Sequence, residues 1–131
     1  MATTELPLHR VLKLSHADAI ERAPAVPKEQ GFGVLTTIDV KTTLKAKLGV
    51  EFPAYTILGA CNPTMAHKAL TIDPTIGVNM PCNVIVRELG DEGVEVRAVD
   101  PIKTIGAGGN EGLAEPAQKV REMLAAAIAA L

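Results

Sequence analysis

The strongest constraint on the fold is a β-hairpin in the second half of the chain. Two apolar runs, 82–89 and 94–100, flank a tetrapeptide of turn-forming residues at 90–93. The second run alternates valine and alanine with Glu95 and Arg97, which predicts one buried face and one largely solvated face. An antiparallel pair of strands is therefore expected at this point.

Strands and helices alternate before the hairpin. The predicted strands are 8–14, 32–38 and 55–60. A helix follows each of them, and the residues that precede these helices are the N-cap types Ser15, Asp39 and Asn62. Pro24 and Pro27 interrupt the first helix, so we expect it to end or kink at 22–25.

A long amphipathic helix closes the chain. Its apolar stripe consists of Leu113, Ala117, Val120, Leu124, Ile128 and Leu131. The pattern predicts an α+β fold in which a mixed β-sheet has helices packed on it, with a C-terminal β-hairpin followed by a long helix. Residues 1–131 are expected to form a single domain.

Composition excludes several classes of function. Aromatic residues make up 2% of the chain and the net charge is -2, so both the stacking platforms and the basic surface of nucleic-acid-binding proteins are missing. No apolar window reaches the length of a membrane span, and the first twenty residues do not form a signal peptide. We therefore expect no nucleic-acid or membrane partner and a cytoplasmic location, where the two cysteines would be reduced.

The candidate chemistry lies between residues 56 and 82, which include both cysteines and one of the three histidines. Cys61 directly precedes Asn62 at a helix N-terminus, a position that favours the thiolate. Cys82 opens the first run of the hairpin, so the two thiols would approach each other if that run pairs with 55–60. His67 follows Cys61 by six residues and could lean back toward it.

These residues leave several interpretations open. A Cys₂His set of Cys61, His67 and Cys82 would suit zinc or copper. Alternatively, the cysteines are small buried hydrophobic residues and His67 lies on the surface. The C-x₂₀-C spacing lacks the C-x₂-C pairs of a strong zinc motif, and no nucleophile-elbow or phosphate-loop motif is present. The sequence therefore assigns no reaction and no cofactor.

Several segments together resemble a known family. They read GFGVLTTIDV, LKAKLG, YTILGACNP, AHKAL, MPCNV and AVDP, and they span residues 31–101. In these segments the chain resembles the family of domains of unknown function numbered 302, DUF302. The resemblance implies a two-layer α/β fold with a mixed sheet and a tendency to form homodimers. It implies no activity.

Three functional hypotheses follow, and we keep them in this order. The first is a homodimeric domain that binds a small molecule or cofactor near the GACNP turn, with Cys61, Asn62, His67 and Cys82 as candidate site residues. The second is a thiol-dependent redox or sulfur-handling protein that uses Cys61 and Cys82. The third is a structural interaction domain.

Overall fold

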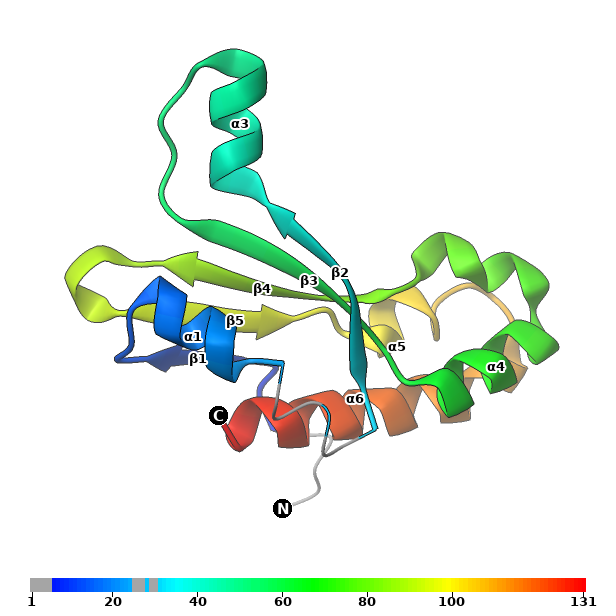
Figure 1. Ribbon diagram of the computed structural model, residues 1–131. Helices are drawn as coiled ribbons and strands as arrows, with labels where there is room; N and C mark the ends of the chain where they lie inside the picture. The colour runs from blue at the N-terminus through cyan, green and yellow to red at the C-terminus, as the bar shows by residue number, and fades with distance from the viewer. Residues whose placement is uncertain (1–5, 25–27, 29–30) are drawn as a thin grey trace.

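The protein is built around one five-stranded sheet with the strand order β1-β5-β4-β3-β2 (Figure 1). The computed structural model describes residues 6–24, 28 and 31–131 of the 131-residue chain. The strands are β1 (His9–Leu12), β2 (Gly33–Asp39), β3 (Tyr55–Cys61), β4 (Cys82–Glu88) and β5 (Val94–Ala98). The predicted strands and the hairpin between β4 and β5 are thus confirmed.

Every pair of neighbouring strands in this sheet is antiparallel. The predicted two-layer α+β architecture is confirmed, but the mixed sheet is corrected to an antiparallel one. The reason lies in the helix α3 (Val40–Leu48) between β2 and β3. A parallel pair would need this helix to cross back over the sheet, whereas β2 and β3 pair directly, with Asp39 opposite Thr56, and α3 lies beyond their ends (Figure 1).

The helices that pack on the sheet cover only one of its faces. The long C-terminal helix α6 (Ala114–Ala129) and the short α1 (His16–Arg22) bury apolar side chains against β3, β4 and β5. Residues at the centre of this core include Val86, Val94, Val96, Leu124 and Ala125. Because side chains alternate along a strand, the opposite face carries the remaining strand residues, and none of the described core residues comes from it.

Four further helical segments form a second, smaller core beside the main one. They are α4 (Pro63–Ile72), α5 (Pro101–Thr104) and the 3₁₀ segments η2 (Pro74–Asn79) and η4 (Glu111–Leu113). Their buried apolar side chains are Ala69, Ile76, Ile105 and Leu113, packed with Ala117 of α6. This group lies at the end of the sheet where β3 finishes and β4 begins (Figure 1).

Side-chain caps fix the predicted helix starts. Ser15, Asp39 and Asn62 each accept a hydrogen bond from the backbone N–H three residues further on, at 3.1, 3.0 and 3.1 Å. α1 ends at Arg22 as expected, while residues 25–27 of the proline-containing segment lie outside the described residues. No helix among the described residues is long and apolar enough to cross a membrane.

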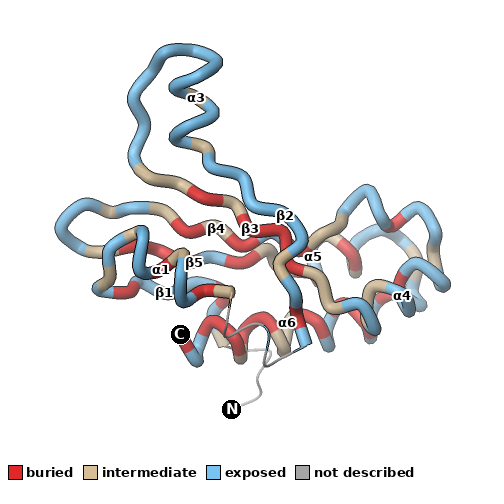
Figure 2. The backbone as a smooth tube through the Cα atoms, viewed as in Figure 1, coloured by how far each residue is buried: buried red, intermediate tan, exposed pale blue. Residues whose placement is uncertain are grey.

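α3, the end of β2 that leads into it and the loop 49–54 form an arm that stands away from the body of the molecule (Figures 1 and 2). Gly49 ends α3 in the left-handed conformation, with a φ of 68°. No residue of α3 is buried, and six of the seven residues of β2 are exposed. α3 therefore packs only partly on its own protomer: it contacts β3, and Val40 and Leu44 are half-buried.

Candidate functional site

The GACNP turn joins the end of β3 to the start of α4. Cys61 is the last residue of β3, Asn62 caps α4, and Pro63 is the first helical residue. Gly31 packs against this turn with a φ of 86°, and a Cβ on it would lie 2.9 Å from Asn62 Nδ2. The backbone at the turn is therefore tightly enclosed on this side.

The strand register brings the two cysteines to the same end of the sheet. Cys82 opens β4 opposite Ala60, so Cys61 is only one residue removed from it in the pairing. Both cysteines, together with Asn62, line one apolar cavity of about 30 Å³ between the sheet end and α4. Both are free thiols, Cys82 buried and Cys61 half-buried.

The electrostatics of the two thiols differ from the sequence expectation. Burial raises the pKa of Cys61 above its ordinary value, although the residue stands at the helix N-terminus. Burial and the neighbouring Cys61 raise the pKa of Cys82 to about 11. Burial therefore disfavours the thiolate form of both cysteines at this end of the sheet.

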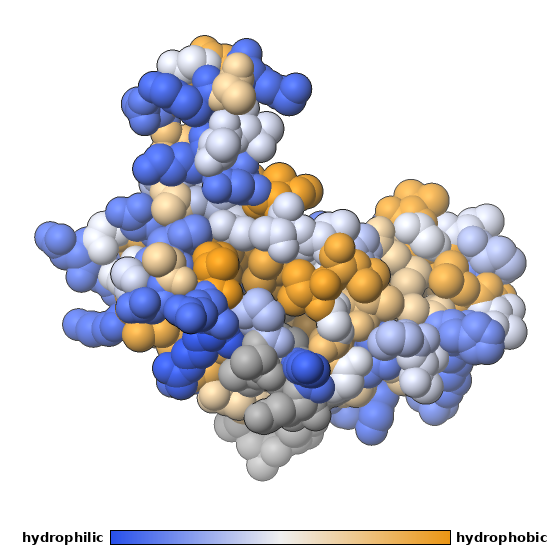
Figure 3. All heavy atoms as spheres, in the orientation of Figure 1, coloured by the Kyte–Doolittle hydropathy of each residue, from blue (hydrophilic) through white to orange (hydrophobic). Residues whose placement is uncertain are grey.

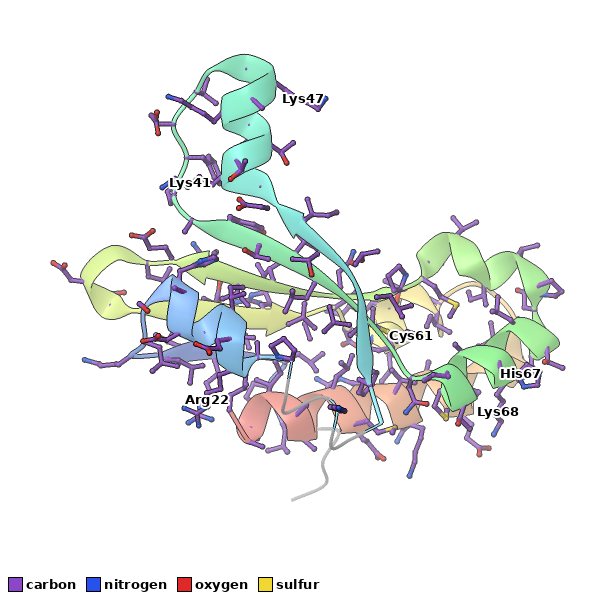
Figure 4. The ribbon with its side chains drawn as sticks, viewed as in Figure 1. Arg22, Lys41, Lys47, Cys61, His67 and Lys68 are labelled. Atoms are coloured by element: carbon purple, nitrogen blue, oxygen red, sulfur yellow. The ribbon has the colours of Figure 1, made fainter. Side chains whose placement is uncertain are left out.

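His67 does not join this group. It is exposed on α4, away from Cys61 (Figure 4), and does not line the cavity. The helix turns Met65, Ala66 and Ala69 toward the cavity instead. The predicted Cys₂His set is therefore not assembled, and no three of the described His, Cys, Asp and Glu residues form a metal-binding group.

Two methionines that the sequence reasoning missed complete the cavity wall. Met65 lies in the first turn of α4, and Met80 directly precedes Pro81 and Cys82. The sequence signal was the run Met80-Pro81-Cys82, which places a thioether and a thiol two residues apart. The candidate residues that the cavity brings together are therefore Cys61, Asn62 and Cys82, with Met65 and Met80 beside them and His67 outside.

The helix-free face of the sheet is a second candidate surface. Ile38 pairs with Ile57, and Ile57 pairs with Ile85, so three isoleucines form a row across β2, β3 and β4. Ile57 and Ile85 are half-buried, and Ile38 is 48% exposed. Figure 3, viewed with α1 in front of the strands, shows apolar side chains gathered on that side of the body below the arm.

An ion-pair group lies beside the isoleucine row on the same face. Glu95 of β5 accepts hydrogen bonds from Arg87 Nε at 2.7 Å and from Arg97 Nη2 at 2.9 Å. The Arg87 hydrogen bond, followed by that of Arg97, holds the pKa of Glu95 below its ordinary value. The carboxylate is buried between the two arginines, whereas the arginines are about half exposed.

Comparisons with known proteins agree with this architecture. The family model described as domain of unknown function DUF302 matches residues 8–131. Among solved structures, this chain is similar to the uncharacterized conserved protein DUF302 from Bacillus stearothermophilus, with 27% sequence identity and a TM-score of 0.83. That match covers 93% of this chain and 96% of the other chain. No curated protein matches the chain.

Proposed function

Because this chain belongs to the DUF302 family, whose description assigns no activity, we propose its function from its own surface: it is a self-associating domain that works as a homodimer. Two copies pack through the helix-free faces of their sheets, and each arm extends over the partner. The row of Ile38, Ile57 and Ile85 on that face is the observation that carries the proposal. Burying apolar surface of this kind stabilises an interface by roughly 25 cal/mol per Å².

The arm supports the proposal independently. α3 has nine residues, and isolated helices shorter than about 12–15 residues are marginal in water unless they pack on something. The end of α3 and the loop beyond it expose apolar side chains at Leu48, Val50 and Phe52, which are 69%, 44% and 39% exposed. A partner that covers the arm would supply the packing that one protomer does not.

The total surface area is consistent with an uncovered interface. The chain exposes 7493 Å². A folded monomer of 13.7 kDa is expected to expose about 6,600 Å², roughly 900 Å² less. A standard interface buries about 800 Å² on each partner, so a second copy is a partner of suitable size.

Charge also favours a second copy over a different protein. Lys41 and Lys47 lie on the arm, where Figure 4 labels both. Glu88, Asp91 and Glu92 lie at the tip of the β4–β5 hairpin. One chain therefore carries both basic and acidic side chains, which a two-fold interface can pair across the two copies.

Sedimentation velocity tests the homodimer. The wild type is expected to sediment with twice the mass of the chain at tens of micromolar. Ile38→Lys is expected to sediment as a monomer, because a charge at the end of the isoleucine row would be buried without a partner. Ile38 is already half exposed in the protomer, so the far-UV circular dichroism of this variant is expected to stay unchanged.

Val78→Lys is the matched control. Val78 is 88% exposed on η2, far from the arm, and the same change of residue type there is expected to leave the dimer intact. A monomeric wild type would contradict the proposal. So would an Ile38→Lys variant that remains as dimeric as the control.

A second candidate function is ligand binding at the GACNP cavity. The observation that favours it is that Cys61, Asn62 and Cys82 line one cavity. A volume of about 30 Å³ is that of a single water molecule in the liquid, so the ligand must be very small unless the cavity widens. Native mass spectrometry of protein purified without added metal tests this function, because a retained adduct lost in Cys61→Ser would support it.

The thiol redox hypothesis receives less support from the same cavity. A reactive cysteine needs a stabilised thiolate, whereas burial raises the pKa of both thiols. The geometry therefore favours a binding role for this cavity over a nucleophilic one.

A further inference from the structure

We propose that the GACNP cavity is a binding site for a soft monovalent metal ion, Cu(I), held by sulfur atoms of Cys61, Cys82, Met65 and Met80. This inference rests on the second candidate function, ligand binding at the cavity, and names the class of ligand. It does not depend on the homodimer, since one protomer supplies every residue that lines the cavity.

Sulfur-containing side chains are concentrated at this cavity. Four of its twelve lining residues carry sulfur, and these four include both cysteines and two of the four methionines of the chain. No carboxylate and no imidazole lines the cavity. The donors on offer are therefore thiols and thioethers, supplemented by the amide of Asn62.

The four sulfur-containing residues that line the cavity lie on different elements of the fold. Cys61 ends β3, and Cys82 begins the neighbouring strand β4. Met65 stands on the first turn of α4, and long side chains on a helix lean toward its N-terminus, which here is the Cys61 end. Met80 approaches from the segment between η2 and β4.

The donor chemistry discriminates between metal ions. Thiolate and thioether sulfur select Cu(I), whereas oxygen ligands suit magnesium, calcium and manganese. Zinc is bound by cysteine, histidine and carboxylate side chains, most often four of them, and the cavity offers only two residues of these types. The thioethers of Met65 and Met80 are therefore the groups that favour Cu(I) over zinc.

The surroundings suit a small, poorly hydrated ion. Phe32, Ile105 and Val120 line the cavity with apolar surface, which disfavours a strongly hydrated divalent ion. Cys61, Met65 and Met80 are half-buried, so solvent can reach three of the four sulfur residues. Binding would release the proton of each coordinating thiol to solvent.

Competition with a coloured Cu(I) chelator, bathocuproine disulfonate, under anaerobic conditions tests the inference. The full chain is expected to withdraw one Cu(I) ion per protomer, measured as loss of the absorbance of the chelate. In Met65→Leu/Met80→Leu the affinity is expected to fall by roughly tenfold or more, because both thioethers are lost. Leucine conserves the volume of methionine, so this variant is expected to remain folded.

Met123→Leu is the matched control, since Met123 packs beside the main core and does not line this cavity. Its Cu(I) affinity is expected to equal that of the wild type. Two results would overturn the inference: a wild type that leaves all copper on the chelator, or a double methionine variant that binds copper as tightly as the control.

Native mass spectrometry of the same preparation distinguishes failure of the Cu(I) assignment from failure of ligand binding at the cavity, the proposed function on which it rests. If native mass spectrometry shows a retained organic mass that depends on Cys61 while no copper is transferred, the Cu(I) assignment is wrong and ligand binding at the cavity stands. If neither copper nor any other mass is bound, both are wrong.

Discussion

Gly93→Ala should destabilise the protein far more than Gly90→Ala, although both glycines belong to the same hairpin. Gly90 has a φ of 73°, and a Cβ there would meet nothing within 4 Å. Gly93 has a φ of 103° and a ψ of -130°, and a Cβ there would lie 2.0 Å from the backbone oxygen of Leu12. Since Leu12 belongs to β1 and pairs with Val94, the clash can be relieved only by moving β1 away from β5.

The magnitudes follow from these two environments. Alanine at Gly90 costs only the left-handed conformation, about 1–2 kcal/mol. Alanine at Gly93 costs about 1–3 kcal/mol for backbone strain and about 1–3 kcal/mol more for overpacking against β1. We expect Gly93→Ala to be the less stable variant by roughly 2 kcal/mol, or a Tm difference of about 8 °C in a domain of this size.

Thermal unfolding followed by circular dichroism measures this difference. Both variants must be compared at one protein concentration, because the melting temperature of a homodimer depends on concentration. Equal melting temperatures would show that the approach of Gly93 to the Leu12 carbonyl does not constrain the sheet, and the reasoning would be refuted.

Three further predictions concern the core, the ion pairs and the thiols. Leu124→Ala, at a position only 1% exposed, should lower the free energy of unfolding by about 2–5 kcal/mol in urea titrations, and a loss below about 1 kcal/mol would contradict the assigned core. Because Arg87 lowers the pKa of Glu95, the stabilisation by this carboxylate is present above its unfolded pKa and is lost as pH falls through its folded pKa. The melting temperature of the wild type should therefore drop more steeply than that of Glu95→Gln below pH 4.5. Parallel curves for the two proteins would argue against the pairing. Iodoacetamide at neutral pH should label Cys61 slowly and Cys82 more slowly still, as followed by mass spectrometry, and immediate labelling of Cys61 would indicate a thiolate that burial does not suppress.

Local signals in the sequence were sufficient to predict the helices and strands of the fold. The caps Ser15, Asp39 and Asn62 and the left-handed Gly49 act within one helical turn, so each could be read without knowledge of the tertiary structure. The hairpin was equally local, because its turn residues lie between the two strands that it joins. The family resemblance extended these elements to a two-layer fold.

The alternation of strands and helices does not determine whether neighbouring strands of the sheet run parallel or antiparallel. The helices were expected to pack on the sheet, but α3 stands on an arm with no buried residue and leaves β2 and β3 to pair as neighbours. An amphipathic helix indicates that some surface will cover it and does not say which surface. On our proposal that surface belongs to a second copy of the chain.

The candidate site was only partly predictable for a related reason. The proximity of Cys61 and Cys82 depended on the pairing of β3 with β4, which the spacing of the cysteines does not encode. His67 was misplaced because its position on α4 turns it to the surface. Met65 was missed because a methionine on a helix ordinarily indicates core packing, and only the cavity shows which sulfur atoms share a wall.

The most direct test of the homodimer is hydrogen exchange of the β2 backbone amides at increasing protein concentration. If a second copy covers the helix-free face and the arm, protection of residues 33–39 should rise with concentration in the wild type and stay low in Ile38→Lys. Fast exchange of these amides at every concentration, in the wild type as in the variant, would contradict the account.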